Sequence, residues 1–111
     1  MGCVLLVTAD GIGRGDDDLG RRLMPTFLTK APAGLGELAA VALMHGGVRL
    51  AAEGAPALQA LGALEERGVE VVACGTCVDA LGVRERLRVG RVGSMDEILA
   101  LLGRATKVVT L

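Results

Sequence analysis

The chain has 111 residues, the size of one domain (1–111), and can bury a core without disulfide or metal staples. Hydrophobic residues make up 51% of it, yet Phe27 is the single aromatic residue, so aliphatic side chains in layered strands and helices must form the core. The 12 basic and 13 acidic residues nearly cancel, which leaves no positive surplus for a phosphate backbone. We therefore expect no nucleic-acid partner.

The amino terminus does not predict export or membrane insertion. No basic residue precedes the apolar run of residues 3–7, and this run is far shorter than a bilayer span. We expect a cytoplasmic protein, in which the three cysteines (Cys3, Cys74 and Cys77) are reduced rather than paired in a structural disulfide.

The first segments predict a strand and an amphipathic helix. Residues 3–9 are apolar and partly β-branched, which is typical of a buried strand. The aspartates at 16–18 supply capping oxygens and negative charge for a helix start. Leu19, Leu23 and Phe27 recur every four residues with Met24 and Leu28 beside them, which predicts an amphipathic helix.

Prolines divide this helix from the next strand. Pro25 removes one backbone donor, so a kink or a restart is expected there. Proline and glycine at residues 32–36 predict a loop. The wholly apolar residues 38–44 then predict a strand covered on both faces, which residues 45–47 end.

The second half alternates helical and strand patterns. A helix is expected from Pro56 to residues 67–68, and residues 69–74 form the clearest strand of the sequence. Short helical turns are expected at 77–81 and 84–87. The capping box at 94–97 predicts a last helix, and residues 108–111 close the chain as a strand.

This alternation predicts an α/β fold with a mainly parallel sheet and helices on both faces. Ligands of such folds gather at the carboxyl ends of the strands. Here these ends are residues 10–15, 45–47 and 74–77.

The pattern Cys74-Gly75-Thr76-Cys77 follows a strand directly and opens a helical turn. Amides at the helix start can stabilise a thiolate at Cys77, and Gly75 lets the backbone bend after Cys74. Such a thiolate can accept sulfane sulfur as a persulfide or exchange with a disulfide. The alternative is that both cysteines are inert packing residues.

The cysteines and the one histidine also raise the question of zinc. Cys3, His45, Cys74 and Cys77 are the available ligands of these two types. Cys3 begins its strand and Cys74 ends a parallel one, so they should lie roughly 18 Å apart along the sheet. This argues against a closed site within one chain and leaves a site shared between subunits open.

Other groups are expected near the thiols. His45 ends the second strand and could accept a thiol proton, although it could equally be a polar residue that closes a strand. The loop with Gly13 resembles a phosphate loop, but the aspartates after it would repel phosphate, which favours a capped turn. Arg14 could still hold an anionic sulfur species. The arginines at 84–91 form a solvated face or a docking surface for an acidic partner.

Several spaced segments resemble one known family. They are the Gly-Arg-Gly-Asp-Asp after the first strand, the segment 47–54, the Cys-Gly-Thr-Cys motif, Leu-Arg-Val-Gly at 87–90 and Lys-Val-Val-Thr-Leu at 107–111. Together they resemble the DsrE/DsrF-like sulfur-relay family, and within it the DsrE-like domain of the selenium-associated YedF proteins. The likeness covers nearly the whole chain.

The resemblance implies a three-layer α/β/α sandwich with a five-stranded sheet, a homo-oligomer, and a carrier of sulfur or selenium. It implies that Cys74 and Cys77 hold this cargo as a persulfide. From its place at the end of the second strand, His45 is the expected further catalytic residue. Gly13, Arg14, Gly47, Gly75 and Thr76 are the expected substrate-binding residues. The implied donor or acceptor is a cysteine desulfurase or a TusA-like protein, since YedF proteins usually carry a TusA-like domain.

The sequence departs from the family pattern at two positions, and two alternative functions stay open. His45 stands where the family would have asparagine, and Ala52 where relatives often have cysteine. We expect no cofactor and no membrane partner. The rival hypotheses are a noncatalytic oligomerisation or docking module, which a mean hydropathy of +0.51 favours, and a metal site shared between subunits.

Overall fold

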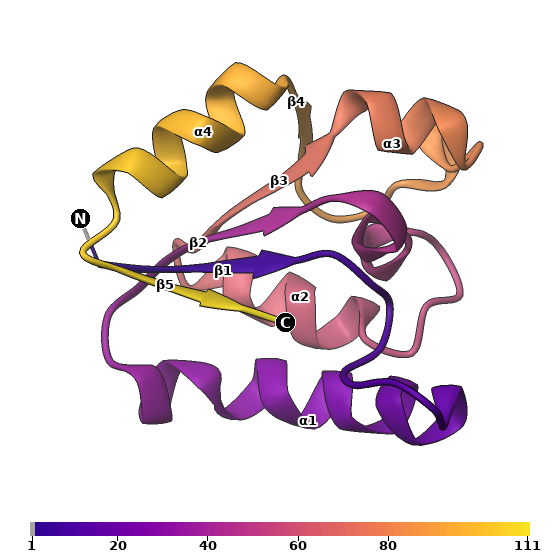
Figure 1. The fold of residues 1–111 in the computed structure, drawn as a ribbon, viewed down its shortest axis with the longest axis horizontal. Helices are drawn as coiled ribbons and strands as arrows, with labels where there is room; N and C mark the ends of the chain where they lie inside the picture. The colour runs from indigo at the N-terminus through magenta and orange to yellow at the C-terminus, as the bar shows by residue number, and fades with distance from the viewer. Residues whose placement is uncertain (1) are drawn as a thin grey trace.

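The fold is a five-stranded sheet in which all neighbouring strands run parallel, in the order β4-β3-β2-β1-β5 (Figure 1). The computed structural model describes residues 2–111. The strands are β1 (Cys3–Val7), β2 (Leu38–Leu43), β3 (Glu70–Cys74), β4 (Arg91–Gly93) and β5 (Lys107–Thr110). Because the strands are parallel, their carboxyl ends meet at one edge of the sheet.

Helices cover both faces of this sheet, so the predicted three-layer α/β/α sandwich is confirmed (Figure 1). The helices are α1 (Asp17–Leu35), α2 (Leu58–Glu66), α3 (Gly75–Ala80) and α4 (Met95–Arg104), with 3₁₀ helices η1 (His45–Ala51) and η2 (Arg84–Arg86). Helices α1 and α2 pack against each other on one face, and α4 lies on the other. Helix α3 and η1 meet at the carboxyl edge.

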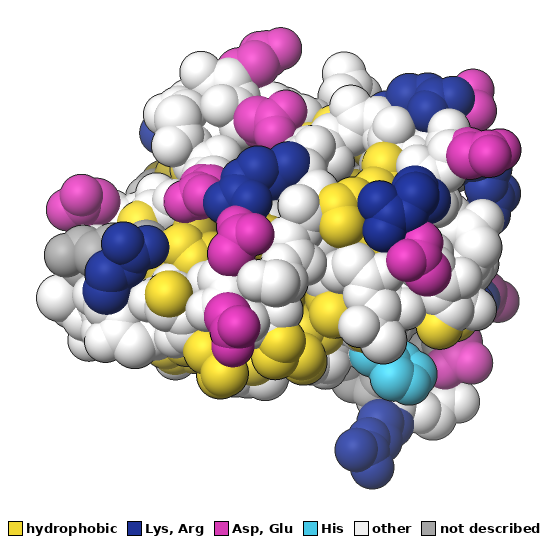
Figure 2. Space-filling view, turned by 90° about the horizontal axis from the view of Figure 1, so that it is seen from above, with side chains coloured by type: hydrophobic (Ala, Val, Ile, Leu, Met, Phe, Trp, Pro, Cys, Tyr) yellow, Lys and Arg dark blue, Asp and Glu magenta, His cyan; other side chains and the backbone are white. Residues whose placement is uncertain are grey.

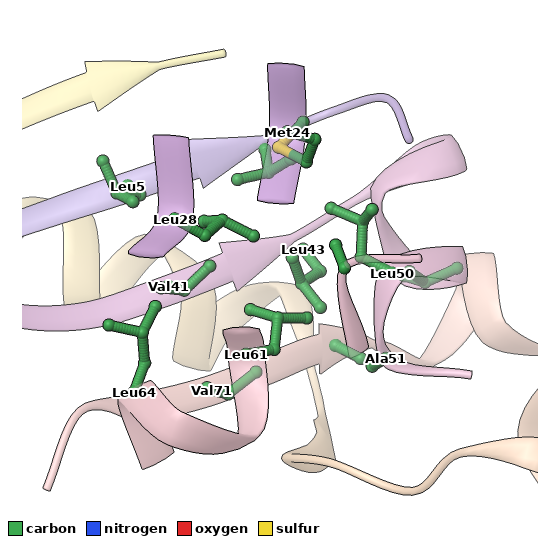
Figure 3. Packing of buried hydrophobic residues seen from close by; sticks show 14 of the residues in the cluster. Leu5, Met24, Leu28, Val41, Leu43, Leu50, Ala51, Leu61, Leu64 and Val71 are labelled. Atoms are coloured by element: carbon green, nitrogen blue, oxygen red, sulfur yellow. The ribbon is translucent and has the colours of Figure 1, made fainter. Parts of the chain in front are cut away.

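Alternate residues of each strand enter two separate cores, as the two-residue period of a strand dictates. Leu5, Val41 and Val71 face α1 and α2 in the larger core, which Figure 3 shows. Val4, Ala40 and Val72 face α4, with Ile98 and Leu101, in the smaller core. A sheet buried on both faces explains why residues 38–43 form an unbroken apolar run.

Helix α1 differs from its prediction in two ways. It runs without interruption through Pro25 and Pro32 to Leu35, so the predicted restart and the predicted loop at 32–36 are wrong. Each proline lacks only one backbone donor, and burial of Met24 and Leu28 against the sheet offsets that loss.

The buried face of α1 also contains only part of the predicted apolar stripe. Leu19 and Leu23 are 48% and 44% exposed, while Gly20, Met24, Leu28 and Ala31 are buried. The aspartate cap is confirmed, because the side chain of Asp16 accepts a hydrogen bond from the amide of Leu19. A four-residue repeat therefore identified the helix but not the side of it that faces the sheet.

Two elements have no counterpart among the segments predicted from residue patterns. Strand β4 has three residues at the edge of the sheet and begins with an arginine, which is a weak strand signal. Arg91 is held there by ion pairs with Glu70 and Glu97. The other is η1, the 3₁₀ helix after β2.

The predicted capping box is confirmed, since Ser94 and Glu97 cap each other at the start of α4.

Candidate functional site

The two cysteines of the Cys-Gly-Thr-Cys pattern lie where β3 ends and α3 begins. Cys74 is the last residue of β3 and the N-cap of α3, with extended backbone angles (φ −61°, ψ 122°). Gly75 starts α3 beside β4, where an added Cβ would lie 3.2 Å from Cγ1 of Val92. This tight turn brings residue 77 back toward the end of β3, so the two thiols become neighbours.

Cys74 is buried, with 2% of its surface exposed, and packs in the smaller core with Val72 and Ile98. Burial alone raises the pKa of its thiol. Hydrogen bonds from the amide and thiol of Cys77, and from the amide and hydroxyl of Thr76, act the other way and leave the pKa of Cys74 below its ordinary value. Cys74 is thus a buried thiol whose anion is stabilised by hydrogen bonds from the turn that follows it.

Cys77 is half-buried at the same edge and contacts both cores. The backbone amide of His45 donates a hydrogen bond to its Sγ over 3.0 Å. Burial raises the pKa of Cys77, the His45 amide lowers it, and the hydrogen bond and negative charge of Cys74 raise it, so the pKa of Cys77 ends above its ordinary value. The two thiols therefore titrate as one unit, in which Cys77 holds the last proton.

The geometry of η1 explains why a backbone amide reaches Cys77. His45 has a φ of +50°, the left-handed region that L residues other than asparagine, aspartate and histidine rarely adopt. Gly47 lies so close to the end of β1 that an added Cβ would be 2.2 Å from the carbonyl oxygen of Val7. The amide of Met44 also donates to that carbonyl over 2.9 Å. These contacts fix η1 against β1 and aim the first amide of η1 at the thiol.

The predicted site residues are brought together in part. Cys74, Cys77, Gly75 and Thr76 share one turn, and His45 joins them through its backbone. The imidazole of His45 belongs to an exposed residue, and its predicted catalytic role stays a prediction.

The remaining predicted binding residues form no hydrogen bond or ion pair with the thiols within residues 2–111. Gly13 and Arg14 sit in the exposed loop after β1, and no hydrogen bond or ion pair links Arg14 to the thiol pair within residues 2–111. Gly47 is buried against β1. Their predicted role in substrate binding stays a prediction.

Cys3 lies at the opposite edge of the sheet. It pairs in register with Leu38 and Lys107, at the starts of β2 and β5, whereas Cys74 pairs with Gly93 at the end of β4. In the part of the chain from residue 2 onward, no three His, Cys, Asp or Glu side chains are grouped as metal ligands would be.

One charged pair near the thiols was not singled out by the sequence. Arg84 donates to both carboxylate oxygens of Asp79, over 2.6 and 3.0 Å, and its Nη2 would lie 3.9 Å from a Cβ at Gly75. The guanidinium holds the pKa of Asp79 below its usual range. This pair places an arginine beside the start of α3. The dense arginine stretch was the only sequence signal for it.

The fold and the thiol pair define a parallel α/β protein whose candidate site lies at the carboxyl edge of its sheet. A family model, the DsrE/DsrF-like family, matches residues 3–111, and the chain belongs to this family, which is associated with sulfur relay. None of the curated proteins matches the chain.

Two solved structures share this fold. The YchN protein from E. coli is 19% identical, with a TM-score of 0.71, and 100% of each chain is covered. A protein of unknown function, MTH1491 from Methanobacterium thermoautotrophicum, is 18% identical, with a TM-score of 0.68 and 96% of this chain and 97% of that chain covered. Within residues 2–111, no helix is both long and apolar enough to cross a membrane.

Proposed function

We propose that the protein is a sulfurtransferase-like carrier in which Cys77 accepts sulfane sulfur, or selenium, as a persulfide-type cargo. The observation that carries this proposal is the contrast within one pair of thiols: Cys77 is half-buried and held by the His45 amide, whereas Cys74 beside it is buried. Family membership supports it, since the DsrE/DsrF-like family is associated with sulfur relay.

In the first step, the thiolate of Cys77 attacks the terminal sulfur of a donor persulfide, R–S–SH. The S–S bond of the donor breaks, R–S⁻ leaves, and Cys77 becomes Cys77–S–SH. In the resting pair Cys77 holds the proton, so its attack requires that this proton pass to Cys74 along the hydrogen bond between the two thiols. The His45 amide then stabilises the anion on Cys77.

Delivery can follow two routes. A thiolate of an acceptor protein attacks the terminal sulfur and restores Cys77 as the thiolate. Alternatively, Cys74 attacks Sγ of Cys77, the S–S bond to the terminal sulfur breaks, and HS⁻ leaves as the two cysteines are oxidised to a disulfide. The lowered pKa of Cys74 favours the second route, because it raises the thiolate fraction of the resolving cysteine above that of an ordinary thiol.

The partners of this cycle follow from its chemistry. The donor is a protein that generates a persulfide, such as a cysteine desulfurase, and the acceptor is a TusA-like protein. Each cycle begins with reduced thiols, so we expect the protein to act in the cytoplasm. The exposed arginines 84, 86 and 88 follow α3 closely and would complement an acidic partner surface.

The test is persulfide transfer followed by mass spectrometry of the intact chain. Reduced protein is incubated with a cysteine desulfurase and cysteine, and a mass gain of one sulfur atom is expected. Cys77→Ser should abolish the gain, and Cys3→Ser, the matched control at the other edge of the sheet, should keep it. Cys74→Ser should accept sulfur but release no sulfide. Wild-type protein that gains no sulfur from a loaded desulfurase would refute the proposal.

A specific observation also favours self-association. Met95, Leu99 and Val108 are 43%, 57% and 43% exposed, and Figure 2 shows hydrophobic side chains between charged ones on the α4 side of the molecule. We propose that a second copy covers this surface, which would make the protein a homo-oligomer. Sedimentation should show a species larger than one chain, and Leu99→Glu should dissociate it. A wild-type monomer at high concentration would refute this second proposal.

A further inference from the structure

A cavity separate from the thiol pair lies at the carboxyl edge, on the side of the sheet that carries α1 and α2. Its volume is about 180 Å³, and its lining comes from the loop after β1, from α1, η1 and η2, and from the segment before α2. A single water needs only ~10–15 Å³ of such space. Sites for drug-sized ligands measure roughly 300–1,000 Å³. The cavity therefore has the size for one small molecule.

Charges of both signs line this cavity. They are Arg21, Arg49, Arg86, Asp10 and Glu53. Two of them already have partners outside the cavity: Arg21 pairs with Asp18 over 2.8 Å, and Glu53 pairs with Arg88 over 3.1 Å. These pairs neutralise much of the charge that the two residues would offer to a ligand.

The other three charged groups are available. Arg49, Arg86 and Asp10 form no ion pair and no side-chain hydrogen bond with any residue from 2 to 111. Two cationic forks and one carboxylate around a small space suit a ligand with a carboxylate and a cationic group. A dianion such as phosphate fits less well, because the unpaired carboxylate of Asp10 would repel it.

The rest of the lining is apolar. Leu50 and Val83 are buried in the larger core, and Ala55 and Pro56 close the cavity on the α2 side. A ligand between these walls needs a short apolar or weakly polar side chain as well as its charged groups.

We propose that this cavity binds a small α-amino acid as its zwitterion. The carboxylate pairs with Arg49 and Arg86, the ammonium group faces Asp10, and the side chain contacts the apolar wall. This site is separate from the thiol pair. None of Cys74, Cys77 and His45 lines it, and Cys74 packs on the opposite face of the sheet. The inference therefore does not rest on the sulfur-carrier proposal.

The experiment is calorimetric titration of the full chain with glycine, L-alanine, L-serine and L-valine. Propionate and ethylamine serve as analogues of alanine that lack one charged group each, and inorganic phosphate tests for a general anion site. At least one amino acid should bind with one molecule per chain. Alanine should bind about tenfold more tightly than either analogue, since each loses a charge-assisted contact.

Variants separate the three parts of the proposal. Arg49→Ala and Arg86→Ala should each weaken amino-acid binding about tenfold. Asp10→Asn should remove the preference for alanine over propionate, and Ala55→Leu should fill the cavity and abolish binding. Arg104→Ala, an exposed arginine at the end of α4, is the matched control and should bind as the wild type does. Circular dichroism checks that each variant is folded.

Three results would overturn the proposal. The first is phosphate binding more tightly than every amino acid of the panel. The second is the absence of binding by all panel members at millimolar concentration. The third is unchanged binding by folded Arg49→Ala and Arg86→Ala. Cys77→Ser should bind the amino acid normally, so failure of this site and failure of persulfide transfer can be told apart.

Discussion

The two edges of the sheet contain equally buried cysteines in different surroundings. Cys3 at the amino edge and Cys74 at the carboxyl edge are both 2% exposed. Cys3 sits between two strand starts, where its backbone amide donates to the carbonyl of Glu37. Cys74 is followed by the turn into α3, which supplies amide, hydroxyl and thiol donors to its sulfur. Because Cys3 and Cys74 are equally buried, the hydrogen-bond donors of the turn are what distinguishes the surroundings of the Cys74 sulfur.

The largest expected contrast is in alkylation of the native protein. Cys77 is the accessible thiol and should react first with iodoacetamide. Cys3 is buried and should react at least about a hundredfold more slowly, because it needs an opening of the fold. Mass spectrometry of the digested chain reports each site. Equal rates at Cys3 and Cys77 would mean that the two edges do not differ in access.

The next contrast concerns glycines that meet a carbonyl at each edge. An added Cβ would lie 2.2 Å from the carbonyl oxygen of Val7 at Gly47, and 2.2 Å from that of Glu37 at Gly2. Gly47 lies within η1 and is buried against the end of β1, so the chain there has little room to move. Gly47→Ala should cost about 1–3 kcal/mol of unfolding free energy.

Urea unfolding measures this cost, and two substitutions calibrate it. Gly2→Ala should cost less, because the carbonyl that the added methyl group would meet belongs to Glu37, an exposed residue that can shift away. Gly34→Ala, at a helical position with open space around the added methyl group, should stabilise the protein by about 0.5–1 kcal/mol. If Gly47→Ala were as stable as the wild type, η1 would be less tightly fixed than we infer.

The sequence predicts the position of the two thiols but not the contacts around them, and the reason is physical. The position of Cys74 and Cys77 follows from a strand pattern and a two-residue spacing, which are local properties. The contact of the His45 amide with Cys77 joins residues 32 positions apart and depends on a left-handed φ that the pattern does not encode. The prediction of short elements is limited for the same reason. Strand β4, for example, is held by ion pairs of Arg91 with residues of two other elements.

The amino-acid cavity illustrates the same limit. Its charged residues come from positions 10 to 86, and only the crossover of the parallel strands brings them together. The apolar pattern within a helix is local, and it identified α1, but it did not show that Met24 and Leu28 are buried while Leu19 and Leu23 are exposed. Local signals thus give elements and the thiol motif, while contacts between elements complete both sites.

A smaller effect is expected from the hydroxyl that lowers the pKa of Cys74. Thr76→Val removes this donor, so the pKa of Cys74 should rise and the thiolate fraction at neutral pH should fall. Thr76→Ser keeps the hydroxyl and is the matched control. Ultraviolet absorbance of the thiolate during a pH titration measures the change. An identical titration of the valine and serine variants would exclude a role for the hydroxyl.

The same pair predicts how stability varies with pH. The pKa of Cys74 is lower in the folded chain than in the unfolded chain, so its contribution to stability is lost as pH falls through the folded pKa and is complete above the unfolded pKa. The pKa of Cys77 is raised, so its contribution is present below the unfolded pKa and lost as pH rises through the folded pKa. The pair's contribution to the unfolding free energy should therefore pass through a maximum near the ordinary thiol pKa. Chemical denaturation of the wild type and of Cys74→Ser across this range measures it, and equal pH dependence in the two proteins would contradict it.

The smallest effect is expected at His45, where the backbone and not the imidazole contacts Cys77. Asparagine tolerates a φ of +50° well, so His45→Asn should change the unfolding free energy by only a few tenths of a kcal/mol. His45→Ala should lose about 1 kcal/mol, because alanine adopts the left-handed region at a cost. Both variants keep the amide, so both should accept sulfur as the wild type does if the amide alone acts. A loss of persulfide uptake in His45→Asn, with stability unchanged, would instead assign the proton transfer to the imidazole and make His45 a catalytic residue.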